Sequence, residues 1–300
     1  ATLPMLDAAA TQAALPFSKL IPALRELFVA GCEVPQRLSL ELRAPDGGPS
    51  LTSLLMPAWQ PGGYYAVKIV NVAPANAARG LPGLHASLAL MDGDQVTARR
   101  TAAASALAAS YLARHDASHL LVLGAGRVAE LLPAAYREVR NIQRVSVWAR
   151  KYPAALALAD RLCQQGFNAL AVAELAPAVG AAHIISCATL AREPLVQGRW
   201  LQPGSHLDLI GSFTPGMREA DDDCFVRASL FIDSDEALAK SGDLLGPMAH
   251  GQLTATDVRA RLSDLCQGTH AGRSYDAERT VFKSVGSALE DLAAAMLAMM

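Results

Sequence analysis

A short apolar segment that leads into two glycines constrains the fold of this chain more than any other feature. Leu121, Val122 and Leu123 are followed directly by Gly124-Ala125-Gly126-Arg127-Val128-Ala129, which predicts a strand, a tight turn and a helix. Downstream, helices are predicted over 128–139 and 154–165, and short apolar strands over 119–123, 145–148, 169–172, 183–187 and 205–210. Strands and helices that alternate at this spacing predict a parallel sheet with helices on both faces.

The first hundred residues follow a different pattern. A helix is predicted over 18–30, with Ser18 as its N-cap and Gly31 as its stop. Strands over 36–43 and 51–56 flank Pro45-Asp46-Gly47-Gly48, which is typical of a hairpin, and a third strand is predicted over 64–70. Alanine-rich helices are predicted over 101–114 and 281–300.

These patterns divide the chain. We expect a Rossmann-type doubly wound α/β domain over residues 116–282. We expect a smaller α+β domain to consist of residues 1–115 together with 283–300, since the last helix returns to the first domain.

Composition excludes several classes of protein. The longest stretch without a charged residue, 47–67, contains three prolines and four glycines, whereas a membrane-spanning helix needs roughly 18 consecutive apolar residues. The chain has 26 Lys and Arg against 28 Asp and Glu and no basic run, which argues against nucleic acid as a partner.

Cysteine usage and the start of the chain indicate a compartment. The five cysteines are widely spaced and lack the spacing of a metal site, and no basic segment precedes an apolar block at the start. We therefore expect free thiols, no metal, no signal peptide and a cytoplasmic location.

The glycine turn carries a chemical prediction. In a dinucleotide fold, Gly124 would make the turn, Gly126 would let the backbone approach the pyrophosphate, and Ala129 would let the helix pack closely on the strand. The phosphates would then lie at the helix N-terminus, where N–H groups favour anions. A single motif of this kind is also compatible with a purely structural turn, but its place in the first of several strand–helix units favours dinucleotide binding.

The end of the second strand of this domain bears on the choice of dinucleotide. Trp148-Ala149-Arg150-Lys151 contains no carboxylate for the ribose 2′-hydroxyl of NAD, and a cation suits the 2′-phosphate of NADP. This favours NADP, with NAD as the alternative. If Arg150 is simply a solvated residue at a helix start, it carries no such preference.

Three cations stand out in the first domain. Arg37, Lys68 and Arg100 lie within apolar sequence, where a buried charge is costly unless it meets an anion. If all three converge on one cleft, they would bind a substrate carboxylate, which Arg can hold with two hydrogen bonds. Each of them alone is equally compatible with a surface or salt-bridged residue.

Motifs along nearly the whole chain point to one family. They are Val67-Lys68-Ile69-Val70-Asn71, Gly80-Leu81-Pro82, Leu90-Met91-Asp92-Gly93, Thr97-Ala98-Arg99-Arg100-Thr101-Ala102-Ala103, Leu123–Ala129, Ile210-Gly211-Ser212-Phe213-Thr214-Pro215-Gly216-Met217-Arg218-Glu219 and Val281-Phe282-Lys283-Ser284-Val285-Gly286. In this order they strongly resemble the ornithine cyclodeaminase and mu-crystallin family.

The resemblance implies a two-lobed, homodimeric NAD(P)-dependent enzyme that acts on small amino or imino acids. It implies substrate contacts at Arg37, Lys68 and Arg100, with Lys68 and Arg100 as catalytic residues. It also implies cofactor contacts at Gly124, Gly126, Arg127, Arg150, Thr189 and Ser284.

One departure from the family pattern bears on the reaction. In cyclodeaminases the stretch after Ile210 carries an acid/base Asp and then a Lys, and here Phe213 and Met217 stand in those places. A phenyl ring cannot relay a proton, and this form is similar to relatives that reduce cyclic imines. Phe213 would pack on the substrate or the nicotinamide, or alternatively in the core.

We therefore expect an NAD(P)H-dependent reductase of a small cyclic imino acid, Δ1-pyrroline-2-carboxylate or Δ1-piperideine-2-carboxylate. The alternatives are an ornithine cyclodeaminase, which converts ornithine to proline and ammonia, an amino-acid dehydrogenase, and a non-catalytic, crystallin-like binding protein. A second departure lies between His85 and Met91, where family members carry a further strand and turn.

Overall fold

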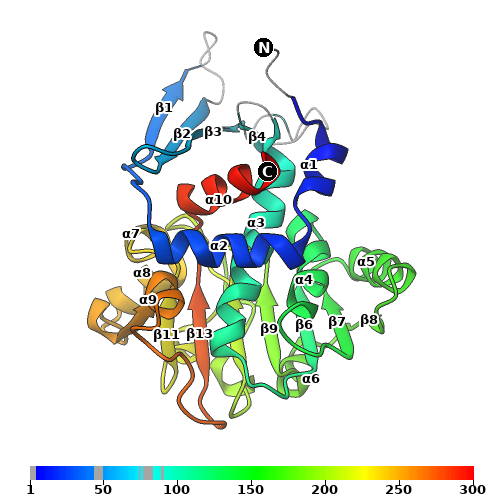
Figure 1. Cartoon of the computed structure of the whole chain (residues 1–300). Helices are drawn as coiled ribbons and strands as arrows, with labels where there is room; N and C mark the ends of the chain where they lie inside the picture. The colour runs from blue at the N-terminus through cyan, green and yellow to red at the C-terminus, as the bar shows by residue number, and fades with distance from the viewer. Residues whose placement is uncertain (1–4, 44–49, 74–75, 77–83, 89–90) are drawn as a thin grey trace. The chain divides into compact units, whose positions relative to one another are not determined.

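The computed structural model describes residues 5–43, 50–73, 76, 84–88 and 91–300 (Figure 1). The described residues form two compact units, one from Ala1–Arg100 and Ser287–Met300 and one from Thr101–Gly286. Gly80, Leu81, Pro82 and Leu90 of the motifs above, and the Pro45–Gly48 turn, lie outside the described residues.

The second unit is built on one eight-stranded sheet in which every pair of neighbouring strands is parallel. In sheet order the strands are β12 (Val258–Arg261), β11 (Ser229–Ile232), β13 (Thr280–Lys283), β10 (His206–Leu209), β9 (Ile184–Cys187), β6 (His119–Leu123), β7 (Arg144–Trp148) and β8 (Ala169–Ala171). The chain leaves β6 toward β7 on one side and later returns at β9 on the other. The predicted doubly wound α/β architecture is therefore confirmed.

Apolar strands and amphipathic helices build the core of this unit. All five residues of β6 are buried, as is typical of a parallel strand covered on both faces. The helices that alternate with the strands are α4 (Arg127–Arg137), α5 (Tyr152–Gln164), α6 (Leu175–Ala181), α7 (Glu236–Lys240), α8 (Gly242–Ala249) and α9 (Leu262–Gln267).

The first unit combines helices with a five-stranded antiparallel sheet. Its strands are, in order, β1 (Leu38–Leu42), β2 (Leu51–Trp59), β3 (Tyr65–Val72), β4 (Leu84–Leu88) and β5 (Met91–Asp92). Its helices are α1 (Ala8–Ala14), α2 (Phe17–Ala30) and α10 (Ala288–Ala298), and α3 (Gly93–Leu112) continues from this unit into the second. Helix α10 contacts α2, β2 and β3, so the end of the chain helps to form the core of the unit that begins it.

Three expectations about the elements are wrong. Residues 280–283 form β13 in the middle of the parallel sheet, and the last helix spans only Ala288–Ala298, because Val281 and Phe282 are fully buried between neighbouring strands. Ser18 is not an N-cap, since α2 begins at Phe17 after Pro16. Helix α3 begins at Gly93 rather than at residue 101.

The segment between His85 and Met91, which departs from the family pattern, begins in β4 and ends at β5. β4 pairs with β3 on one side and with β5 on the other, so this edge of the antiparallel sheet is built from residues on both sides of positions 89–90. Within the part of the chain that the structure describes, every helix is too short or too polar to cross a membrane.

Candidate functional site

The carboxyl edge of the parallel sheet gathers most of the residues singled out from the sequence. All the strands point the same way, so the residues that follow them lie at one edge, which is where ligands of open α/β sheets bind. Those residues are Gly124 and Gly126 after β6, Arg150 after β7, Thr189 after β9, Phe213 after β10 and Ser284 after β13.

The two glycines of the turn after β6 have different environments. Gly124 has a φ of +119°, and a Cβ atom there would lie 2.5 Å from the carbonyl oxygen of Ala188, so the turn requires glycine. Gly126 has an ordinary φ of −87°, and a Cβ atom would meet nothing within 4 Å. Ala129 is fully buried below the turn. Close packing therefore explains Gly124 and Ala129, whereas Gly126 borders open space.

The start of α4 favours an anion. Gly126 is its N-cap and has no side chain to accept hydrogen bonds from the N–H groups of the first turn. Arg127 and Arg150 are both exposed near this edge. The geometry and the charge suit a phosphate group.

The segment after β9 is held by a residue that sequence reasoning did not single out. The carboxyl of Glu219 accepts hydrogen bonds from both the backbone N–H and the Oγ1 of Thr189, each at 2.7 Å. Glu219 is fully buried, and burial raises its pKa to about 8 against the opposing charge of Lys283. The only signal in the sequence was its place at the end of the Ile210–Glu219 motif.

The loop after β10 presents Phe213 outward. Ser212 is buried with a φ of +53°, and its hydroxyl donates to the Met217 carbonyl at 2.5 Å and accepts from the Asp243 N–H at 2.9 Å. Phe213 is 40% exposed, so core packing does not account for it, whereas Met217 is buried. The loop is held from inside while the phenyl ring faces outward.

Lys283 at the end of β13 joins two of these segments. Its ammonium donates to the carbonyl oxygens of Leu209, at 2.9 Å, and Gly211, and lies 3.7 Å from Oδ2 of Asp243. The N–H of the neighbouring Ser284 donates to Leu209 at 3.2 Å, and the Ser284 side chain is buried. These contacts fix the edge of the sheet between β10 and β13.

In the first unit, Lys68 and Arg100 meet two carboxylates of α10. Lys68 Nζ lies 2.6 Å from Asp291 Oδ2, Arg100 Nε lies 3.0 Å from Asp291 Oδ1, and Arg100 Nη1 lies 2.7 Å from Glu290 Oε2. All four side chains are buried. The anions expected to meet these buried cations therefore include two of the chain's own residues, which the sequence analysis missed. Arg37 precedes β1 and is half-buried.

Burial and charge shift the pKa values in this cluster. Burial lowers the pKa of Lys68 to about 8, while Asp291 acts in the opposite direction. Burial alone would raise the pKa of Asp291, but Lys68 and Arg100 hold it below its usual value. Lys68 and Asp291 therefore form an ion pair at neutral pH.

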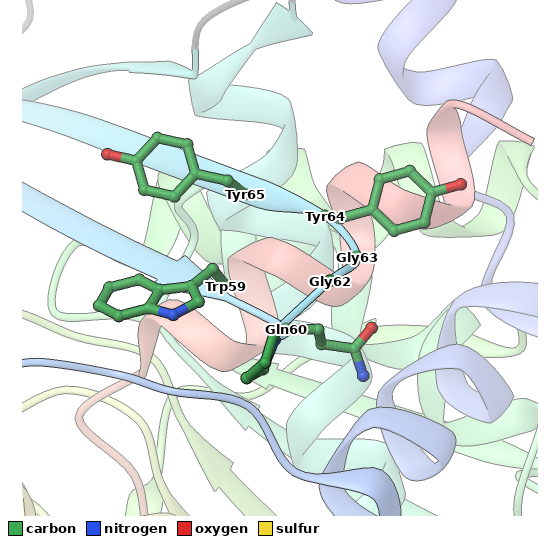
Figure 2. A pocket seen from close by; sticks show the side chains of 7 residues that line it. Trp59, Gln60, Gly62, Gly63, Tyr64 and Tyr65 are labelled. Carbon is green, nitrogen blue, oxygen red and sulfur yellow. The ribbon is translucent and has the colours of Figure 1, made fainter.

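A hollow of about 490 Å³ lies at the turn between β2 and β3 (Figure 2). The rings of Trp59 and Tyr65 lie on one side of it with their centroids 6.3 Å apart, and the Tyr64 ring points away from them. The described residues that line it include no carboxylate, histidine, lysine or arginine, so we do not assign catalysis to it. No group of three or more His, Cys, Asp or Glu side chains among the described residues has the arrangement of a metal site.

Comparisons with known proteins agree on one family. The model of the ornithine cyclodeaminase/mu-crystallin family matches residues 5–299. A Δ1-pyrroline-2-carboxylate reductase of Paracoccus denitrificans is 44% identical over 259 residues, which cover 82% of each chain. The structure of Thermococcus litoralis Δ1-pyrroline-2-carboxylate reductase in complex with NADH and L-proline is 31% identical, with a TM-score of 0.90 over 98% of this chain and 96% of that one.

An archaeal alanine dehydrogenase dimer with bound NAD is also similar in structure. It is 27% identical, with a TM-score of 0.89 over 98% of this chain and 94% of that one. The family match and the identities exceed what a shared fold alone produces. This chain belongs to the ornithine cyclodeaminase/mu-crystallin family.

Proposed function

We propose that this protein is an NAD(P)H-dependent reductase of a small cyclic imino acid, Δ1-pyrroline-2-carboxylate or Δ1-piperideine-2-carboxylate, and forms the cyclic amino acid. The observation that carries the proposal lies at the carboxyl edge of the parallel sheet. An open glycine turn and Phe213 follow strands at this same edge, and Phe213 stands where cyclodeaminases carry an acid/base carboxylate. The similarity to two Δ1-pyrroline-2-carboxylate reductases supports the substrate class.

The unit formed by Thr101–Gly286 is the proposed dinucleotide-binding domain. Gly124 and Gly126 would shape the phosphate site with Arg127 at the start of α4, and Thr189 and Ser284 would contact the rest of the cofactor. The fit rests on the open space at Gly126 and on the uncapped N-terminus of α4. The bound nicotinamide would supply a hydride to the imine carbon.

We infer a preference for NADPH over NADH. Arg150 and Lys151 follow β7 and are exposed, and no carboxylate stands there to accept a hydrogen bond from a ribose 2′-hydroxyl. The two similar solved structures hold NADH and NAD, so NADH is the alternative cofactor.

The other unit is the proposed substrate-binding and dimerisation domain. Arg37, Lys68 and Arg100 would bind the substrate carboxylate. Lys68 and Arg100 would be the catalytic pair, and the lowered pKa of Lys68 suits it to donate the proton that the imine nitrogen needs. One hydride to carbon and one proton to nitrogen complete the reduction of the C=N bond.

An exposed apolar sheet face supports a homodimer. Leu38, Leu40 and Leu42 alternate along β1 and are 52%, 41% and 53% exposed. Leu38 pairs across the sheet with Leu55, and Leu55 with Ile69, which is 38% exposed, so these side chains share one face. A similar archaeal structure is a dimer, and we propose that a second copy of this chain covers the face.

The direct test measures NADPH and NADH oxidation at the nicotinamide absorbance with the two cyclic imino acids. A parallel assay measures ammonia released from ornithine. Oxidation that depends on the imine, without ammonia from ornithine, is the expected result. Ammonia and proline from ornithine would instead establish a cyclodeaminase, and dinucleotide binding without turnover of any of these substrates would indicate a binding protein.

A further inference from the structure

Glu219 links the segment after β9 to the loop after β10. We propose that Glu219 is a positioning residue that fixes Thr189 for dinucleotide binding, and that its carboxyl does so in the protonated, neutral form. This inference rests on the proposed function, because Thr189 is a cofactor contact only in that proposal. The Glu219 side chain has no exposed surface, so Glu219 acts through Thr189 rather than by touching a ligand.

The hydrogen bonds of the carboxyl are concentrated on one residue. Oε1 accepts from both the N–H and the hydroxyl of Thr189, and Oε2 has no hydrogen-bond partner among the described residues. The carboxyl is also enclosed: a Cβ atom on Gly211 would lie 2.4 Å from Cδ of Glu219 and 2.4 Å from the carbonyl oxygen of Thr189. Glu219 therefore has little freedom to move away from Thr189.

The backbone of Glu219 is held as firmly as its side chain. Its N–H donates to Oδ1 of Asp243 at 2.8 Å, and the N–H of Ala220 donates to the same oxygen at 3.1 Å. Asp243 is fully buried at the start of α8. A fixed backbone and a fixed carboxyl together set the position of Thr189 at the end of β9.

The surrounding charges favour the neutral carboxyl. Lys283 from β13 faces Glu219, but its ammonium also lies 3.7 Å from Asp243 of α8. The positive charge of Lys283 is therefore shared between two buried acidic side chains. Arg218 lies 3.7 Å from Asp243 but pairs with Asp222 at 2.6 Å. Cys187 from β9 is buried, and burial raises the pKa of its thiol, so it adds no charge. Burial raises the pKa of Glu219 itself to about 8.

Ionisation of Glu219 would oppose dinucleotide binding. A new negative charge on Glu219, in contact with Thr189, would repel the anionic dinucleotide in a poorly screened interior. Lys283 would not fully offset this charge, because it also faces Asp243. Because Glu219 in the folded protein keeps its proton up to about pH 8, the affinity for the dinucleotide should be constant below that pH and fall above it. A glutamine at this position keeps the shape and the acceptor oxygen and cannot ionise.

The experiment titrates NADH and NADPH into wild type, Glu219→Gln and Glu219→Ala, followed by fluorescence of the bound nicotinamide, from about pH 6.5 to 9.5. At neutral pH, Glu219→Ala should weaken binding about tenfold because Thr189 loses both acceptors, and Glu219→Gln should stay within about twofold of wild type. Above pH 8, wild type should weaken at least about threefold while Glu219→Gln stays constant. Glu236→Gln, a matched change in the surface ion pair with Lys240, should behave as wild type throughout.

Two results would overturn the inference. Unchanged affinity in a folded Glu219→Ala protein would show that Glu219 does not position Thr189. An alkaline loss of affinity in Glu219→Gln equal to that of wild type would show that the neutral carboxyl is not the working form, and this comparison decides the matter even if Glu219→Ala does not fold. If wild type binds neither dinucleotide at any pH, the proposed function itself fails, which is a separate outcome.

Discussion

The carboxylate of Asp291 joins Lys68 to Arg100. One oxygen lies 2.6 Å from the Lys68 ammonium, the other lies 3.0 Å from Nε of Arg100, and all three side chains are buried. Asp291 comes from α10, near the end of the chain, so these contacts tie the last helix to β3 and α3.

Replacing Asp291 with Asn should destabilise the protein by about 3 kcal/mol or more, since among the contacts of the described residues it removes the carboxylate that both buried cations share. The free energy of unfolding in urea measures the effect. Asp116→Asn is the control, because Asp116 pairs with Arg114 in an exposed bridge and its loss should cost less than about 1 kcal/mol. Equal effects of the two changes would contradict the role of burial.

Alanine at Gly124 should destabilise the fold, whereas alanine at Gly126 should weaken dinucleotide binding. Gly124→Ala forces a Cβ against Ala188 at a φ of +119° and should destabilise the fold by about 2 kcal/mol or more. Gly126→Ala meets no atom within 4 Å, so the melting temperature should stay the same. If the open space holds the phosphates, Gly126→Ala should weaken NADPH binding at least about tenfold, and unchanged binding would place the phosphates elsewhere.

Arg150→Ala should reduce the preference for NADPH over NADH about tenfold, because it removes a cation from the proposed 2′-phosphate site. The ratio of kcat/KM for the two cofactors measures this preference. Arg161→Ala on α5 removes an exposed cation that pairs with Glu130 at 3.0 Å and should leave the ratio unchanged. Equal ratios in wild type and Arg150→Ala would mean that Arg150 does not contact the cofactor.

Asp208 should make the stability of the protein depend on pH. It is fully buried on β10, where burial raises its pKa to about 6 while hydroxyls of Ser105, Tyr136 and Ser186 donate to it. A raised pKa adds stability that is fully present below 3.8, the value in the unfolded chain, and is lost as the pH rises to about 6.

Between those pH values, Asp208→Asn should therefore remove a decline in the free energy of unfolding of up to about 1.4 kcal/mol per pH unit. Urea unfolding of both proteins across this range is the measurement. Asp160→Asn, an exposed change on α5, should follow the wild-type slope. Parallel curves for wild type and Asp208→Asn would show that Asp208 does not hold a proton in the folded state.

A lysine on the exposed face of the antiparallel sheet should dissociate the proposed dimer. Ile69→Lys places a charge in the row with Leu38 and Leu55, and it should weaken self-association at least about tenfold. Sedimentation velocity measures the change. Leu170→Lys on β8 replaces an apolar residue of similar exposure, 42%, in the other unit and should not alter assembly. A dimer that survives Ile69→Lys would use another face.

Local sequence determined the elements whose pattern and steric needs lie within a few residues. The strand, glycine turn and helix around Gly124 are where the motif predicts them, because a parallel strand needs a continuous apolar run and the turn needs a residue that tolerates positive φ. The alternation of such units is also sufficient to predict the parallel sheet of the second unit. The resemblance to one family, confirmed over residues 5–299, depends on the same local motifs.

Tertiary contacts decided the rest. Residues 280–283 are a strand rather than part of a helix because neighbouring strands bury Val281 and Phe282, whereas the alanine-rich helix begins only at Ala288. Asp291 contacts Arg100 across 191 positions of the chain, and Glu219 contacts Thr189 across 30. A buried charge requires a partner, but the sequence does not say which of many carboxylates will reach it, since that depends on how the helices and strands pack.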